Sequence, residues 1–191
     1  NWPTVGGAGG GIYNAGTLAL TACMISRNIG QYPGPDSDRG GGIYNAGMLT
    51  LTNCTISDNT APGNGGGGIY NGPSGTLTLT NCTVSGNSSG GTGGIQNRGL
   101  LTLTTCTISD NSGRGEGAGG IVNLSGTLIT LTNCTINGNS VTNNPGGNFG
   151  NGGGICNYLG TVTLTACTVS GNRADHFGGG IYGPCSLRNT L

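Results

Sequence analysis

One short segment recurs along the whole chain, and its spacing constrains the fold more than any other feature. The segment is GGIYN or a close variant, and its isoleucine falls at Ile12, Ile43, Ile69, Ile95, Ile121, Ile155 and Ile181. The intervals are 31, 26, 26, 26, 34 and 26 residues, so a 26-residue unit carries insertions of five and eight residues in two copies. A fixed period of this length is typical of solenoid repeats, in which each unit packs mainly on its neighbours.

The apolar residues of one unit predict three short strands separated by corners. Leu49 and Leu51 alternate with threonine, which is the period of a β-strand. Cys54 and Ile56 continue the alternation in the opposite phase, so one flat strand cannot bury both sets and the chain must bend near Asn53. The GGIYN segment supplies a third set of inward-facing side chains.

These patterns predict an all-β fold, a right-handed parallel β-helix of six to seven coils with about 26 residues and three short strands per coil. A sandwich or barrel of hairpins fits less well. Hairpins pair neighbouring strands, whereas the strongest similarity here lies one full repeat apart. Helix is excluded because glycine and β-branched residues dominate and no 3.6-residue periodicity appears.

Stacked coils would align identical side chains in columns, and two of these columns are asparagine. We expect their amides to face inward at the corners and to bond to the backbone and to the asparagines above and below. A row of ligand-binding amides is the alternative, but turn chemistry favours the structural interpretation. The first column is Asn14, Asn45, Asn71, Asn97, Asn123 and Asn157; the second is Asn28, Asn59, Asn87, Asn111, Asn139 and Asn172.

A third column is cysteine: Cys23, Cys54, Cys82, Cys106, Cys134 and Cys167. We interpret these residues as buried, packed thiols, because no CxxC motif occurs and the chain has a single histidine. Disulfides between adjacent coils are the alternative, since stacked Cα atoms would lie near disulfide distance. Cys156 and Cys185 lie outside the column, and a bridge between them would staple the C-terminal end.

The glycines before each repeat isoleucine are expected to take positive φ, so that the chain can turn sharply. Both insertions fall between the second asparagine column and these glycines, so the long loops at 29–39 and 140–151 should emerge along one edge of the rod. The corresponding loops of all coils carry most of the charge, at Asp36, Asp38, Arg39, Arg114, Glu116, Arg173, Asp175 and His176.

Charge is scarce, with six arginines, no lysine and a net charge of zero beside 44 glycines. Nucleic acid and anionic membranes are therefore not expected as partners. No apolar run approaches the roughly 20 residues that span a bilayer.

The carboxylates do not form an evident catalytic group. Asp58 and Asp110 share a corner but lie two coils apart, so we interpret them as turn residues. Asp36 and Asp38 are a weak candidate for calcium, and His176 lacks a nucleophile partner. We expect no catalytic residue, no cofactor and no enzyme activity, with a polysaccharide-binding or polysaccharide-degrading β-helix as an alternative.

The repeat carries a family resemblance. Gly41, Gly42 and Ile43, followed by Ile56–Asn59, resemble the GGAI and FxxN motifs of polymorphic outer-membrane proteins, with Ile or Val in place of Phe. Gly75–Asn87 reads GTLTLTNCTVSGN and is similar to repeats of secreted bacterial right-handed parallel β-helix proteins. The resemblance implies a bacterial surface or extracellular location and an adhesive or scaffold role. The same fold hosts pectate lyases and polygalacturonases, so it does not imply one function.

Outward-facing threonines support a second functional hypothesis. Such regular arrays resemble the ice-binding face of solenoid antifreeze proteins, although threonine is also simply favoured on exposed strands. The candidate binding face consists of Thr50, Thr52, Thr78, Thr80, Thr102, Thr104, Thr130, Thr132, Thr163 and Thr165. A further column after the bend is Thr55, Thr83, Thr107, Thr135 and Thr168.

The leading functional hypothesis is structural. A solenoid presents bare strand edges at its ends, and natural solenoids cap them. Here only Trp2 and Pro3 offer cover before the first repeat. We therefore expect residues 1–191 to form a single β-helix domain that belongs to a longer chain or stacks end to end with copies of itself. The expected partners are these copies, other surface proteins or glycans.

Overall fold

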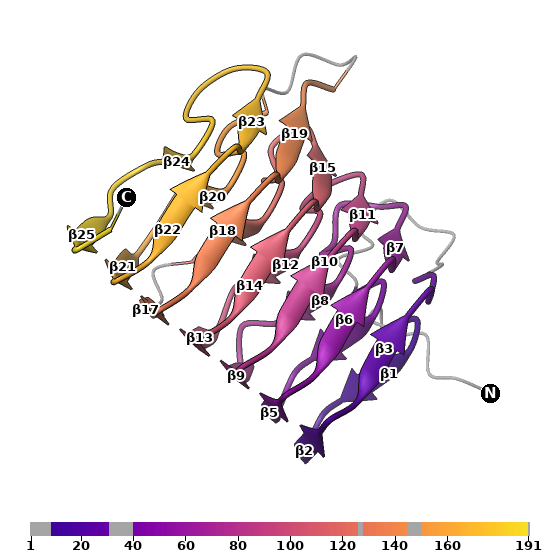
Figure 1. The fold of residues 1–191 in the computed structure, drawn as a ribbon. Helices are drawn as coiled ribbons and strands as arrows, with labels where there is room; N and C mark the ends of the chain where they lie inside the picture. Colours follow the sequence, from indigo (N-terminus) through magenta and orange to yellow (C-terminus); the bar gives the residue numbers. More distant parts are fainter. Residues whose placement is uncertain (1–8, 31–39, 126–127, 145–149, 191) are drawn as a thin grey trace.

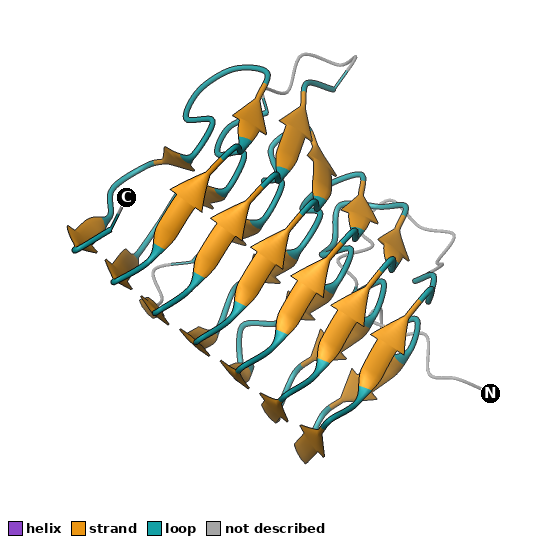
Figure 2. Cartoon of the chain, in the orientation of Figure 1, coloured by secondary structure: helices purple, strands orange, loops and turns teal. Residues whose placement is uncertain are grey.

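The computed structural model describes residues 9–30, 40–125, 128–144 and 150–190 and shows a right-handed parallel β-helix (Figure 1). The chain winds through about six turns of about 28 residues each, which is the 26-residue unit averaged with its two insertions. Strands stack coil on coil with loops between them, and the described residues contain no helix (Figure 2). The predicted fold class is confirmed.

Four parallel sheets run along the rod. Sheet A holds β1 (Ile12–Asn14), β4 (Ile43–Asn45), β8 (Ile69–Asn71), β12 (Ile95–Asn97), β16 (Ile121–Asn123), β20 (Ile155–Asn157) and β24 (Ile181–Tyr182). Sheet B holds β2 (Thr17–Thr21), β5 (Met48–Thr52), β9 (Thr76–Thr80), β13 (Leu100–Thr104), β17 (Leu128–Thr132), β21 (Thr161–Thr165) and β25 (Ser186–Arg188).

Sheet C holds β3 (Met24–Ser26), β6 (Thr55–Ser57), β10 (Thr83–Ser85), β14 (Thr107–Ser109), β18 (Thr135–Asn137) and β22 (Thr168–Ser170). Sheet D holds β7 (Thr60–Ala61), β11 (Ser88–Ser89), β15 (Ser112–Arg114), β19 (Ser140–Thr142) and β23 (Arg173–Ala174). Every pairing places a residue beside its counterpart in the next repeat, as Leu101 lies beside Leu77 and Ile129.

The core is a stack of identical apolar layers. In the second coil Ile43, Leu49, Leu51 and Ile56 are fully buried, and Cys54 is nearly so. Burying side chains of this size is the main favourable contribution to folding, about 1.5–3 kcal/mol for each.

The predicted bend between sheets B and C is present. Asn53 has a φ of 54°, and the same left-handed corner recurs at Asn81 and Thr105. Asn and Asp tolerate this conformation better than most residues, which explains why Asn is frequent there.

Sheet D was not predicted. Its strands follow the second asparagine column, and they pair with one another, as Ser88 pairs with Thr60 and Ser112. The sequence predicts three strands per coil because this stretch has no apolar alternation, yet its backbone groups still bond to the adjacent coils. The coils that contain β7, β11, β15, β19 and β23 therefore have a fourth strand in addition to the three predicted ones.

The repeat glycines take the expected positive φ at Gly152 and Gly178, but elsewhere they have a different role. Gly41 and Gly67 do not take positive φ. They lie so close to the next coil that a Cβ on Gly41 would sit 2.3 Å from the carbonyl oxygen of Gly67. These positions need glycine because only hydrogen fits between the coils.

Both predicted asparagine columns form continuous hydrogen-bonded ladders. In the first column, the Nδ2 of Asn45 donates to the Oδ1 of Asn71 at 2.8 Å, and Asn71 donates to Asn97 at 2.8 Å. In the second, the Oδ1 of Asn111 accepts from both the Nδ2 and the backbone N–H of Asn87, at 2.9 and 3.0 Å. The Nδ2 of Asn111 donates in turn to Asn139 at 2.9 Å. Each buried amide therefore satisfies corner backbone groups that have no strand partner.

Replacing one ladder residue should be costly. We expect Asn111→Ala to lower the free energy of unfolding by about 2–4 kcal/mol, because it leaves buried donors and acceptors of the adjacent coils without partners. The matched control is Ser112→Ala, an exposed neighbour that should change stability by at most about 0.5 kcal/mol. Chemical denaturation followed by circular dichroism would measure both. Equal stability of the two variants would contradict a structural role for the ladder.

Candidate functional site

The outward surface of sheet B is a flat array of uncharged side chains. From β2 to β21 every outward position is Thr, Met, Leu or Ala, and the threonines are in register from coil to coil. Within the columns that contain Thr102 and Thr104, successive side chains are about 4.8 Å apart along the rod. The two columns lie about 7 Å apart across it. Met48, Leu100 and Leu128 are about half exposed along one border of the array. We call this surface the threonine face.

Sheet C continues the pattern with two outward columns of hydroxyl groups. Thr83 and Ser85 lie beside Thr107 and Ser109, and the corner between the sheets carries Asn side chains. In the described residues, the outward positions of sheets B and C meet their first charged residue at Arg188 in β25. The structure thus brings together all ten threonines that the sequence predicted as a binding face.

The outward surface of sheet A differs, because loops cover its middle. Its central column begins with Tyr13, Tyr44 and Tyr70, whose rings stack at centroid distances of 5.4 and 5.0 Å. The same column continues through Gln96 and Val122, which are buried although they point away from the core. This cover could not be predicted from the sequence, since the covering loops lack a repeat pattern.

A cavity of about 230 Å³ lies over this covered part of sheet A. Gln96 and Val122 line it from the strands, and Arg98 and Leu124 line it from the corner after those strands. Arg114 and the segment 115–117 line it from the end of β15. Residues from two distant corners of the coil therefore meet across one sheet.

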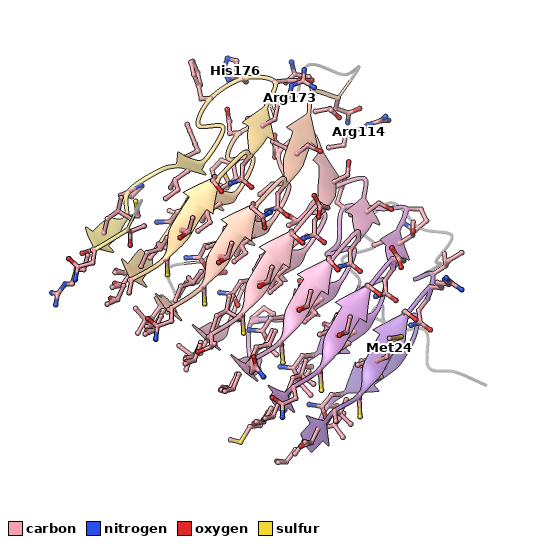
Figure 3. The ribbon with its side chains drawn as sticks, viewed as in Figure 1. Met24, Arg114, Arg173 and His176 are labelled. Atoms are coloured by element: carbon pink, nitrogen blue, oxygen red, sulfur yellow. The ribbon has the colours of Figure 1, made fainter. Side chains whose placement is uncertain are left out.

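In the described residues, charged side chains lie along the predicted loop edge, as expected. Arg114, Arg173 and His176 lie along the same edge of the rod, away from Met24 on sheet C (Figure 3). Arg173 forms an exposed ion pair with Asp175 at 3.0 Å, and His176 contacts the Oδ1 of Asn151 at 3.1 Å. Exposed pairs of this kind contribute little to stability.

The remaining charged candidates that the structure describes lie in turns and are not gathered into a metal-binding group. Asp58 and Asp110 both occupy the left-handed corner after sheet C, each with a φ of 55°, which is turn geometry. Gly86 occupies the same corner between them. No group of three His, Cys, Asp or Glu side chains in the described parts of the chain is arranged to hold a metal ion. Asp36 and Asp38 lie outside the described residues.

The cysteine column is packed in the core. Cys54, Cys82, Cys106 and Cys134 are almost completely buried, and the Sγ of Cys54 donates to the carbonyl of Thr52 at 3.2 Å. Burial raises the pKa of the Cys54 thiol, so it stays protonated at neutral pH.

The bridge considered between Cys156 and Cys185 is not present, because all eight cysteines are free. Cys156 packs with Val122 and Ala118 outside sheet A, whereas Cys185 packs against the main core. Burial raises the pKa of Cys156 to about 12. The two thiols therefore pack in different apolar clusters.

The sequence matches the family model described as the right-handed beta helix region over residues 4–174. The chain therefore belongs to this family. A search of curated proteins found no match, and neither did a search of solved structures. Among the described residues, no helix is long and apolar enough to cross a membrane.

Thiol accessibility provides a direct test of the packed cysteine column. In the native protein near pH 8, only the partly exposed Cys23 and Cys185 should react promptly with a thiol reagent. The buried thiols should react slowly, because the reagent cannot reach them in the packed core. After denaturation without reductant, all eight should react. A deficit of two thiols after denaturation would show a disulfide and contradict the structure.

Proposed function

We propose that this chain is a non-catalytic structural module of a bacterial surface or extracellular protein, which acts as a rigid scaffold or adhesive rod and associates end to end. The observation that carries this proposal is the partial exposure of apolar core residues at the two ends of the described part of the β-helix. Ile43 and Ile95 are fully buried in the middle, whereas Ile12 and Ile181 in the same column are only partly buried. Apolar surface left at an end favours association.

The backbone at these ends supports the same proposal. Within the described residues, β3 and β22 at the edges of sheet C each pair with one strand only. An unpaired parallel edge accepts another strand of matching register, and identical repeats supply that register. A further coil, from a copy or from a longer chain, would bury both the apolar ends and the open edges.

A lysine in the end layer should block this association. Val169 in β22 packs against the core, so Val169→Lys would place a charge where the next coil must stack. Its neighbour Thr168 is exposed on the outward side, so Thr168→Lys is the matched control. Sedimentation velocity should show assemblies that grow with concentration for the parent chain and for Thr168→Lys, but monomer for Val169→Lys. A parent chain that remains monomeric, or two variants that assemble equally, would overturn the proposal.

A second candidate function is ice binding, which the register of the threonine face favours. Flat, uncharged rows of hydroxyl and methyl groups at regular spacing can match a water lattice over several coils. The pairing register is unchanged from β5 to β21, so the array extends over most of the rod.

The ice-binding candidate predicts a specific loss of activity. Purified protein should inhibit ice recrystallisation, and Thr104→Lys should abolish that inhibition by placing a charge in the middle of the threonine face. Ser112→Lys in sheet D of the same coil should retain it, because its exposed side chain lies off that face. Absence of inhibition by the parent chain would end this candidate and leave the structural proposal unaffected.

A further inference from the structure

The tyrosine column on sheet A changes character where the cavity lies. Tyr13, Tyr44 and Tyr70 occupy the column in β1, β4 and β8, and Tyr182 occupies it in β24. At β12 and β16 the column holds the smaller Gln96 and Val122. Cys156 holds the same position in β20, so three successive positions of the column lack a ring, and the cavity lies over Gln96 and Val122.

The walls of the cavity are held in place by hydrogen bonds. The hydroxyl of Ser89 donates to the carbonyls of Gly63 and Gly65 at 3.0 and 2.8 Å. On the next coil, the backbone N–H of Arg114 donates to the carbonyl of Gly91 at 2.8 Å. A site with such pre-formed walls has little ordering entropy to lose when a ligand binds.

Charged side chains are concentrated around this cavity. The described residues include nine charged side chains, Arg27, Asp58, Arg98, Asp110, Arg114, Glu116, Arg173, Asp175 and Arg188, and three of them line the cavity. These are Arg98, Arg114 and Glu116, which give the lining an excess of one positive charge. Two guanidinium groups in one lining suit a carboxylate, because each offers several N–H donors in a fixed plane.

The rest of the lining defines the other features of a ligand. Asn64, Asn144 and Glu116 offer groups that hydrogen-bond to hydroxyls, and the partly buried Leu124 offers an apolar surface on one side. The volume of about 230 Å³ lies below the roughly 300 Å³ at which pockets for drug-sized molecules begin. The ligand must therefore be small, anionic, rich in hydroxyls and apolar on one face.

We propose that this cavity binds a small polyhydroxylated carboxylate, with Arg98 and Arg114 holding the carboxylate and Leu124 contacting its C–H face. No bond is made or broken at this site. The site is independent of the end layers of the rod, so the inference goes beyond the structural function proposed above.

Titration with D-glucuronate, followed by NMR spectroscopy of the full chain, tests the site. We expect saturable shifts for the amides of Gly91, Gly115 and Gly117, and binding at least about tenfold weaker for the neutral D-glucose. Arg114→Gln should weaken glucuronate binding at least about tenfold, since hydrogen bonds to charged groups contribute that much. The matched control is Arg173→Gln, an exposed arginine outside the cavity, which should leave the affinity unchanged.

A second variant tests the electrostatic part of the proposal independently. Glu116→Gln removes the one carboxylate of the lining, so it should bind glucuronate at least as tightly as the parent chain. Each protein's melting temperature would confirm that it is folded. The proposal is overturned if glucuronate gives no saturable shifts, if glucose binds equally well, if Arg114→Gln and Arg173→Gln have the same affinity, or if Glu116→Gln binds more weakly.

Discussion

The fold depends on the hydrogen bond from one asparagine amide to the next. A corner breaks the strand ladder, and its backbone groups need other partners if they are buried. Asn59, Asn87 and Asn111 solve this problem together, because each Oδ1 accepts from the backbone and the side chain of the preceding coil. This geometry requires asparagine above asparagine, and so it holds every coil in the same register.

The register that is fixed at the corners also explains how side chains are arranged on the outer surfaces. Because like residues stack on like, a hydroxyl at one outward position becomes a row of hydroxyls along the rod, and the threonine face follows from the same constraint as the buried leucine columns. Where the repeat departs from its pattern, the surface departs as well. Gln96 and Val122 interrupt the tyrosine column, and a cavity lies above them.

Much of this architecture could be predicted from the sequence, because it is repeated many times. The opposite phases of Leu51 and Cys54 predicted the corner at Asn53, and the asparagine columns predicted the ladders. Sheet D could not be predicted, since strands such as Ser88–Ser89 carry no apolar alternation and pair through the backbone alone.

The cavity was beyond prediction for a related reason. Arg98 and Arg114 come from different corners of one coil, and only the path of the loops brings them to the same sheet. The positive φ expected of the repeat glycines occurs at Gly152 and Gly178 but not at Gly41. Gly41 is required by the closeness of the next coil, a contact between residues 26 positions apart that no local rule describes.

Hydrogen exchange at the corner amides tests the central claim most directly. The backbone N–H groups of Asn59, Asn87, Asn111 and Asn139 all donate to an asparagine side chain of the next coil, at 2.9–3.1 Å. The ladder account predicts that these amides exchange as slowly as the central strand amides of sheet B, because both open only when coils separate. Exchange within seconds, as in an ordinary exposed turn, would contradict it.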